Sequence, residues 1–227
     1  MSEHYISVAI DGPAGAGKST LARALAARLG FVYLDTGAIY RTVACYFAMC
    51  GISARDTDAI TRLIGDVSVA IEYDADGTQR MFLNGEDVTA EIRTPEISGM
   101  TSDISAQPVV RNYLLELQRQ MAGKHNIIMD GRDIGTVVLP RADVKIYLTA
   151  SEQVRAGRRQ AELAQKGTEL PFEQVLAQLQ ERDRNDMNRK TAPLRQAADA
   201  VLLDTSEMDQ SGSLAAAEAL IRERVAL

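Results

Sequence analysis

The chain has 227 residues, of which 46% are hydrophobic and 25% are charged, and its formal net charge at pH 7 is −6. A chain of this size and composition can bury a core as one domain, with or without an insertion, and is not expected to be disordered. The negative net charge gives no support to a protein that binds polymeric nucleic acid, so an anion site has to come from a local basic cluster.

Short apolar runs alternate with amphipathic stretches through most of the chain, and this alternation predicts the secondary structure. Strands are expected at residues 5–10, 31–34, 67–73, 79–83, 126–129, 144–148 and 201–203, with 86–92 returning as a third strand beside the 67–83 hairpin. Helices are expected at residues 18–29, 39–49, 108–121, 154–165, 172–186 and 215–224, the last with Ser213 as its N-cap.

The order of these elements predicts an α/β fold in which a parallel sheet is covered by helices on both faces. The stretch 67–92 interrupts the alternation, because the sequences at 74–77 (Asp-Ala-Asp-Gly) and 84–85 (Asn-Gly) are typical of tight hairpin turns. We expect this stretch to form a small antiparallel insertion and not a separate domain.

The cysteines and histidines of the chain are Cys45, Cys50, His4 and His125, and they do not have the spacing of a zinc site. The cysteines are expected to be two buried thiols on one helix, as in a reducing compartment. The N-terminus MSEHYISVAID lacks the basic flank and apolar core of a signal peptide, and no apolar run could span a bilayer. We therefore expect a cytoplasmic protein that does not associate with membranes.

Residues 12–19, Gly-Pro-Ala-Gly-Ala-Gly-Lys-Ser, match the phosphate-loop pattern G-x-x-x-x-G-K-[ST] at every fixed position. Glycines let such a loop curl its N–H groups around phosphate oxygens, and the next helix directs its positive N-terminal end at the same anion. Lys18 can reach the β- and γ-phosphates of ATP, and the Ser19 hydroxyl can ligate Mg²⁺. A glycine-rich turn that matches by chance is the alternative, but the strand before it and the helix after it are the context that the motif requires.

The chain has no Asn-Lys-x-Asp sequence for reading guanine after the later strands, which argues against a GTPase. A helicase or transporter would normally need a longer chain. A small chain with a phosphate loop and several later arginines favours a kinase that acts on a small metabolite.

Two stripes of charged residues in the C-terminal half have helical spacing: Arg155, Arg158 and Arg159 in one, and Arg182, Asp186 and Arg189 in the other. Three like charges on one helix face repel one another, and a multiply charged anion would reverse that effect. The alternatives are a solvated basic face for the first stripe and a surface ion-pair ladder for the second.

Charged residues also come directly after two predicted strands. Asp130, Arg132 and Asp133 follow the strand at 126–129, and the sequence Leu-Asp-Thr-Gly at 34–37 has the same arrangement after the strand at 31–34. Ligands of open α/β sheets bind beyond the carboxyl ends of the strands, which would place these residues near the phosphate loop. An isolated aspartate at such a position is otherwise more often a turn residue.

Four blocks of sequence resemble the bacterial cytidylate (CMP) kinases, and the resemblance covers nearly the whole chain. The blocks are residues 10–20 with the phosphate loop, 34–41 (Leu-Asp-Thr-Gly-Ala-Ile-Tyr-Arg), 130–138 (Asp-Gly-Arg-Asp-Ile-Gly-Thr-Val-Val), and 182–194, which ends in Ala-Pro-Leu. The phosphate loop is shared by many kinases, whereas the second and third blocks are much more specific.

The resemblance implies a P-loop nucleoside monophosphate kinase fold with a five-stranded parallel core sheet flanked by helices, a small antiparallel insertion in the monophosphate-binding region, and a mobile lid. The 227 residues would form a single domain, with a core at about 1–36, 106–150 and 187–227, the insertion at about 37–105, and the lid at about 151–186. The implied reaction is the ATP-dependent phosphorylation of CMP and dCMP to CDP and dCDP, carried out with Mg²⁺ by a monomer.

The functional residues of the family map onto this sequence as expected site residues. The implied ATP-binding residues are Gly12, Pro13, Ala14, Gly15, Ala16, Gly17, Lys18, Ser19 and Thr20, with Ser19 also as the Mg²⁺ ligand. The implied catalytic residues are Lys18 and Arg132 together with three lid arginines, Arg155, Arg158 and Arg159. The implied CMP-binding residues are Thr36, Arg41, Ser102, Arg111, Arg132, Asp133, Arg182, Asp186 and Arg189.

Within the implied CMP site, Arg41 and Arg132 would clamp the phosphate, and Arg182 and Asp186 would contact the ribose. The implied contacts to cytosine are Ser102, Arg111, Asp133 and Arg189, with Thr101 and Ser105 as alternatives to Ser102. Three other functions stay open: a kinase for UMP, AMP or shikimate, a regulatory nucleotide-binding module without turnover, and a nucleic-acid remodelling ATPase.

Overall fold

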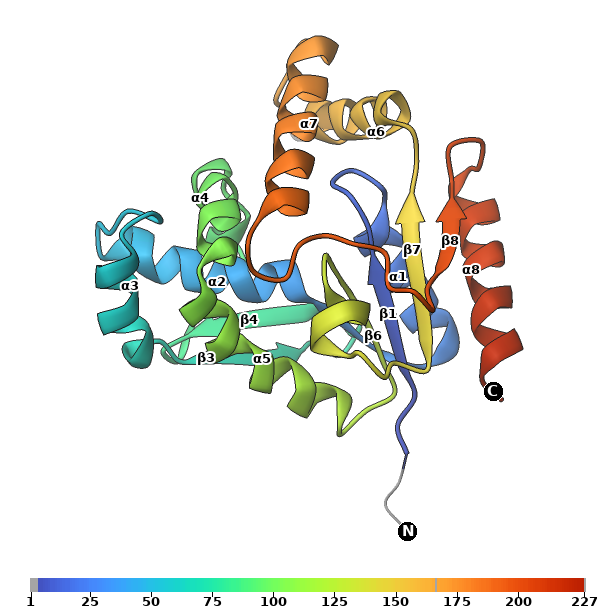
Figure 1. Cartoon of the computed structure of the whole chain (residues 1–227), viewed down its shortest axis with the longest axis horizontal. Helices are drawn as coiled ribbons and strands as arrows, with labels where there is room; N and C mark the ends of the chain where they lie inside the picture. The colour runs from blue at the N-terminus through green and yellow to red at the C-terminus, as the bar shows by residue number, and fades with distance from the viewer. Residues whose placement is uncertain (1–3, 166, 227) are drawn as a thin grey trace.

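A computed structural model describes residues 4–165 and 167–226, so the first three residues of the N-terminal stretch lie outside it. A five-stranded sheet in the order β2-β6-β1-β7-β8 forms its centre, and all four strand pairings in it are parallel (Figure 1). The predicted parallel core sheet is thus confirmed. No helix in the described part of the chain has the length and hydrophobicity that crossing a bilayer requires.

Residues that alternate along the strands bury opposite faces of this sheet. Val8 and Ile10 of β1 pack in a cluster with helices α1 and α8, whereas Ala9 between them packs in the cluster that contains α2, α4 and α5. In β6, Ile128 belongs to the first cluster, and its neighbours Ile127 and Met129 belong to the second. Both faces of the sheet are therefore covered, as a parallel sheet requires.

The strands are β1 Ser7–Asp11, β2 Val32–Asp35, β3 Val69–Tyr73, β4 Gln79–Leu83, β5 Glu86–Asp87, β6 Ile127–Gly131, β7 Val144–Thr149 and β8 Val201–Asp204. The α-helices are α1 Lys18–Leu29, α2 Thr36–Met49, α3 Thr57–Leu63, α4 Pro95–Ala106, α5 Pro108–Ala122, α6 Glu152–Gln165, α7 Phe172–Asn188 and α8 Gln210–Arg224. Short 3₁₀ turns are η1 Ile64–Asp66 and η2 Glu91–Arg93, and η3 Ile134–Val138 is a single π-helical turn.

The predicted insertion is a separate antiparallel sheet in the order β3-β4-β5. The expected third strand at 86–92 is wrong in length, because β5 covers only two residues before the chain turns into η2. Two side chains tie the insertion to β2 of the core: the Tyr73 hydroxyl donates to the Tyr33 carbonyl at 3.0 Å, and Gln79 Oε1 accepts from the Asp35 N–H at 2.8 Å. The insertion therefore packs against the strand end that leads into the site.

Several local features differ from the expectations. Helices α3 and α4 were not expected; α4 begins at Pro95 behind a Thr94 N-cap, a start signal that the sequence carries. Ser213 is wrong as the N-cap of α8, since it lies inside the helix and Asp209 caps it by accepting from the Gly212 N–H. The expectation of two buried thiols is wrong for Cys50, which is exposed at the end of α2.

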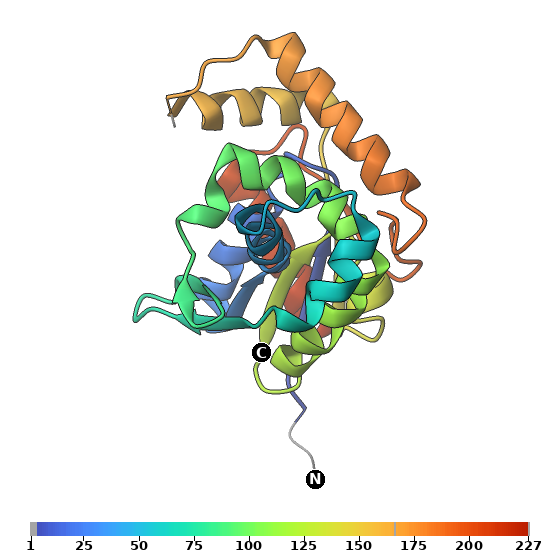
Figure 2. The same cartoon turned by 90° about the vertical axis from the view of Figure 1, so that its left-hand side faces the viewer.

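Helices α6 and α7 pack on each other and stand as a pair beyond the carboxyl ends of the strands, over the loop that follows β1 (Figures 1 and 2). Apart from the last two residues of α7, this pair falls within residues 151–186, the segment predicted as the lid.

Candidate active site

A cavity of about 580 Å³ lies at the carboxyl ends of β1, β2 and β6. The strand register explains why charged residues gather there: Asp35 at the end of β2 pairs with Asp130 of β6, and Asp11 at the end of β1 pairs with Gly131. The expectation that these strand ends and the phosphate loop lie together is thus confirmed. The side chains and backbone that line the cavity include Gly15, Gly17, Lys18, Ser19, Thr20, Arg23, Asp35, Thr36, Arg41, Arg93, Thr101, Ser102, Ser105, Arg111, Asp130, Arg132, Asp133, Arg159, Arg182, Asp186 and Arg189.

The phosphate loop connects β1 to α1 in a conformation that its glycines permit. Gly15 and Gly17 have φ of 72° and 88°, a region that other residues rarely adopt. At Gly12, with φ of 152°, a Cβ atom would lie 1.9 Å from the Leu148 carbonyl oxygen of β7. Helix α1 begins at Lys18, so its positive N-terminal end faces the space that the loop encloses.

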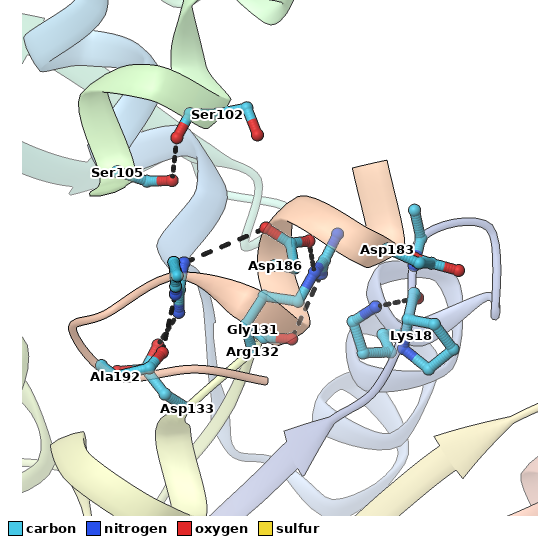
Figure 3. A network of polar contacts seen from close by, with 12 residues as sticks. Lys18, Ser102, Ser105, Gly131, Arg132, Asp133, Asp183, Asp186 and Ala192 are labelled. Carbon is cyan, nitrogen blue, oxygen red and sulfur yellow. Dashed lines mark hydrogen bonds and ion pairs between the residues drawn. The ribbon is translucent and has the colours of Figure 1, made fainter. Parts of the chain in front are cut away.

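Lys18 is held within the phosphate loop by a contact to the loop's own backbone. Its side chain is buried, and its Nζ donates to the Pro13 carbonyl at 2.7 Å (Figure 3). Burial, together with the nearby positive charge of Arg132, lowers the pKa of Lys18 well below its ordinary value. A phosphate group in the loop would offset both effects, because it adds negative charge beside the ammonium group.

Asp130 at the end of β6 organises the floor of the cavity. Its carboxylate accepts hydrogen bonds from the Ser19 hydroxyl and from the Tyr33 hydroxyl, both at 2.8 Å. Burial and the negative charge of Asp35 raise the pKa of Asp130, against the opposing effect of Lys18. A cation beside this carboxylate would therefore be favourable.

The oxygen atoms of Ser19 and Asp130 are of the hard type that Mg²⁺ prefers. The described residues contain no group of three or more histidine, cysteine or acidic side chains that could hold a metal by themselves. Mg²⁺ in kinases is commonly held by one or two protein oxygens plus substrate phosphates, so the two residues fit that mode of binding.

A second charged cluster lies at the other end of the cavity from the phosphate loop. Asp133 is buried between two arginines: Arg111 forms an ion pair with Oδ2, and Arg189 Nη2 lies 3.2 Å from Oδ1. Arg111 also donates to the Ser105 carbonyl at 3.0 Å and lies over the Tyr40 ring, 5.3 Å from its centroid. The cluster thus presents a fixed carboxylate and two guanidinium groups to the cavity.

Four hydroxyl-bearing residues of α4 line the cavity, and three of them, Thr101, Ser102 and Ser105, are the candidates for the base contact. Thr101 donates to the Ile97 carbonyl at 2.7 Å, and Ser105 donates to the Ser102 carbonyl at 3.0 Å. The Ser102 hydroxyl makes no hydrogen bond with any residue that the structure describes, and it lines the cavity (Figure 3). Of the three, Ser102 is the one whose hydroxyl needs no rearrangement to meet a ligand.

Arg132 and Asp186 link the two ends of the cavity. Arg132 Nε donates to Asp186 Oδ2 at 2.7 Å, and Arg189 approaches Oδ1 of the same carboxylate at 4.0 Å. Burial raises the pKa of Asp186, but the positive charges of Arg132, Arg182 and Arg189 outweigh this and keep it below its ordinary value. Arg189 follows the end of α7, so the expected helical stripe of three ends at Asp186.

Arg41 and Thr36 project from the start of α2. Arg41 Nη2 lies 2.8 Å from Asp35 Oδ2, while Asp35 also caps α2 by accepting from the Ala38 N–H. The buried Thr36 hydroxyl donates to the Asp130 carbonyl at 2.7 Å, so it joins the start of α2 to β6 instead of facing an open space.

A family model described as cytidylate kinase matches residues 8–222. Two proteins named cytidylate kinase, from Carboxydothermus hydrogenoformans and Pelotomaculum thermopropionicum, are 51% and 50% identical to this chain over 88% and 90% of its length and 89% and 90% of theirs. The chain belongs to the cytidylate kinase family. An uncharacterized protein from Eubacterium ventriosum shares the fold, with a TM-score of 0.54 at 11% identity over 96% of this chain and 99% of that one.

Membership of the cytidylate kinase family confirms the resemblance predicted from the four sequence blocks and the expected class of enzyme, a kinase with ATP as phosphoryl donor. The roles of single residues stay predictions. The structure brings most of the expected residues to one cavity, including Lys18, Arg41, Ser102 and Asp133.

Two of the three expected lid arginines do not line the cavity. Arg159 does. Arg158 instead donates to the Thr205 carbonyl at 2.7 Å, which ties α6 to the loop after β8. Arg155 is buried against the phosphate loop and donates to the Ala14 carbonyl at 2.8 Å. The three side chains therefore diverge, although their spacing on α6 is that of one face.

Several residues in or beside the cavity of the kinase were not expected as site residues. Tyr33 precedes the recognisable block at 34–41, and its hydroxyl bond to Asp130 joins two strands that are distant in the sequence. Arg23 and Arg93 line the cavity from α1 and η2, and no motif marks them. Asp130 was expected near the phosphate loop because it follows a strand, but no role in the site was assigned to it.

Proposed function

We propose that this protein transfers the γ-phosphoryl group of ATP to the phosphate of CMP, giving ADP and CDP. Its membership of the cytidylate kinase family supports this reaction. The observation that carries the proposal is that one cavity holds both a complete phosphate loop and a buried carboxylate, Asp133, set between two arginines. The first suits a nucleoside triphosphate, and the second suits a base with adjacent donor and acceptor groups.

On the donor side, residues 12–20 would bind the ATP phosphates through the N–H groups of the loop and the start of α1. Lys18 would move its donor from the Pro13 carbonyl to a phosphate oxygen. Ser19 and Asp130 would hold Mg²⁺, with Asp130 positioned by Tyr33. When bound, the metal would neutralise negative charge on the phosphates of ATP.

On the acceptor side, Arg41 and Arg132 would bind the CMP phosphate and orient it toward ATP. Both arginines pair with carboxylates in the structure, at 2.8 Å for Arg41 with Asp35 and 2.7 Å for Arg132 with Asp186. Those carboxylates hold the guanidinium groups in place while leaving other donors for a phosphate. Catalysis then consists of alignment and charge neutralisation, with Lys18, Arg132 and Arg159 around the transferring group.

The base would be read by Asp133 with Arg111, Arg189 and Ser102. Cytosine offers an amino donor at N4 and acceptors at N3 and O2, whereas uracil has an acceptor at position 4 and a donor at N3. A carboxylate therefore accepts from cytosine and repels uracil, while arginine and hydroxyl donors serve the acceptor edge. A site built in this way rejects a base that leaves its buried polar groups unpaired.

The ribose would contact Asp186 and Arg182. Although much of the Arg182 side chain is exposed, partial loss of water around it and the positive charge of Arg132 lower its pKa to about 10. No described residue forms a hydrogen bond or ion pair with it, so its donors are available to a ligand. Because the ribose contacts are few, we include dCMP as a second acceptor.

We further propose that residues 151–186 act as a lid, that residues 37–105 form the monophosphate-binding insertion, and that Thr36 supports the CMP site through the β6 backbone. A monomeric state, a cytoplasmic location and the lack of a polymeric nucleic-acid partner stay predictions from the sequence.

An acceptor panel tests the proposed function. ADP release is coupled to a spectroscopic readout, with CMP, dCMP, UMP, AMP and shikimate as acceptors and with ATP alone as the blank. We expect the highest kcat/KM for CMP and little release of ADP in the blank. A higher kcat/KM for AMP, UMP or shikimate would refute the acceptor, and release that needs no acceptor would point to an ATPase.

A further inference from the structure

The phosphate loop is part of the hydrophobic core of the two helices above it. Ala14 of the loop is buried in a cluster with Ala156 of α6 and with Val175 and Leu179 of α7. At Gly15, a Cβ atom would lie 3.1 Å from the backbone oxygen of Arg155, so a larger residue would require the start of α6 to shift by a few tenths of an ångström. The loop and the helix pair are therefore in direct contact through close-packed atoms.

The buried ion pair between Arg155 and Asp183 holds Ala14 of the phosphate loop at both its N–H and its carbonyl group. Asp183 Oδ1 accepts from the Ala14 N–H at 2.9 Å, and Arg155 Nη1 donates to the Ala14 carbonyl at 2.8 Å. The two side chains also pair with each other at 2.5 Å, and they are 5% and 6% exposed for Arg155 and Asp183. Asp183 lies beside the loop that carries Lys18 in Figure 3.

These contacts leave Arg155 little freedom to act on a phosphate. Its Nε donates to the Ala150 carbonyl at 3.0 Å, so its donors face protein acceptors on several sides, and it does not line the cavity. To reach a ligand it would have to leave Asp183 buried without its partner, which is costly. The pair instead holds the Ala14 peptide groups in one orientation, since Asp183 accepts from the N–H and Arg155 donates to the carbonyl.

We propose that Arg155 and Asp183 are positioning residues that set the phosphate loop from helices α6 and α7, so that the arrangement of the lid helices and the binding of ATP are coupled. This rests on the proposed function only in taking the loop as the ATP site. It replaces the direct catalytic contact that the family resemblance implied for Arg155. Arg155 comes from the start of α6 and Asp183 from the last turns of α7, so both helices must be in place for the loop to keep its shape.

Two mild substitutions and their combination test the proposal: Arg155→Lys, Asp183→Asn and the double variant. Glu181→Gln is the matched control, because Glu181 lies on the same helix, is exposed, and does not line the cavity. Affinities for ATP and for CMP are measured separately by calorimetry, and urea unfolding confirms that each variant is native. Each single substitution is expected to weaken ATP binding by about 10-fold to 100-fold, since small displacements at a site can have effects of that size.

The double variant is expected to be little weaker than either single variant, because the two residues act as one unit. CMP affinity and the Glu181→Gln control should stay within about twofold of wild type, a change of about 0.4 kcal/mol. A loss of kcat in Arg155→Lys with an unaffected Asp183→Asn would overturn the proposal and assign Arg155 to the phosphates. Equal losses for ATP and CMP would overturn it in favour of general destabilisation.

Hydrogen exchange of the wild-type protein tests the coupling without any variant that could fail to fold. On addition of ATP, amide protection is expected to rise together at residues 12–17 and at the segments around 155 and 183. Protection confined to residues 12–17 would contradict the coupling. Neither measurement depends on which acceptor is phosphorylated, so a failure in the acceptor panel leaves this test intact.

Discussion

Replacing Asp133 by Asn is expected to weaken the discrimination between CMP and UMP. The Asp133 side chain is 5% exposed, and both of its oxygens already face arginines. Each carboxylate oxygen has a further lone pair, which can accept from the N4 amino group of cytosine. Asparagine keeps the shape of the side chain, but it loses the negative charge and gains a donor that suits the carbonyl of uracil.

The size of the expected loss in kcat/KM follows from the negative charge on the Asp133 carboxylate, which would accept the hydrogen bond from cytosine. A hydrogen bond to a charged group contributes about 1.5–3 kcal/mol, which corresponds to about 10-fold to 150-fold in kcat/KM. We expect kcat/KM for CMP to fall within that range, while the value for UMP stays the same or rises. The free energy of unfolding is also expected to fall by about 3 kcal/mol, the lower end of the cost of breaking a buried ion pair, because Arg111 and Arg189 keep backbone acceptors.

The assay is coupled ADP release with CMP and with UMP at one fixed ATP concentration, for wild type, Asp133→Asn and the control Asp58→Asn. Asp58 is an exposed carboxylate on α3 and does not line the cavity. Urea unfolding is measured on the same preparations, so that rates refer to native protein. An unchanged ratio of the two kcat/KM values in native Asp133→Asn would refute the base-reading role of Asp133.

Lys18→Ala is expected to lower kcat with CMP by about 100-fold or more while the protein stays folded, and near wild-type turnover would mean that the ATP site is misassigned. Asp186→Asn should reduce kcat/KM for CMP about 10-fold more than for dCMP, which lacks the 2′-hydroxyl; equal losses would indicate that Asp186 acts only through Arg132. Burial raises the pKa of Asp11 from 3.8 to about 6, so the Asp11 carboxylate binds a proton more readily in the folded protein than in the unfolded chain. The stability of wild type relative to Asp11→Asn should therefore fall by about 1 kcal/mol between pH 5 and pH 7, and urea titrations without that decline would show that Asp11 does not titrate in this range.

Much of the core could be predicted because local sequence signals, such as the residues that begin and end a helix, have the same role in the folded protein. Helix α1 begins and ends where Lys18 and Gly30 indicated, because the phosphate loop and a left-handed glycine fix its two ends. Helix α2 begins three residues before its first expected residue, Ile39, because the Asp35 carboxylate both caps it and pairs with Arg41. The spacing of apolar residues, from which the helix was predicted, gives no information about that capping contact.

The sequence was enough to predict which residues gather at the site, but not which partners their side chains contact. The positions of Asp130 and Asp133 followed from the rule that strand ends meet at one edge of a parallel sheet. The divergence of Arg155 and Arg158 did not, because helical spacing gives the direction of a side chain and not the acceptors that it finds. Arg155 meets Ala14 and Asp183, which lie 141 and 28 residues away in the sequence.

The fate of the γ-phosphoryl group shows whether the protein transfers it from ATP to CMP or releases it by hydrolysis. Wild-type protein is incubated with ATP labelled in the γ-phosphate and with CMP, and the nucleotides are separated by ion exchange. We expect the label to appear in CDP in a 1:1 ratio to the ADP formed, as the transfer reaction requires. Label found in inorganic phosphate, with no labelled CDP, would contradict it.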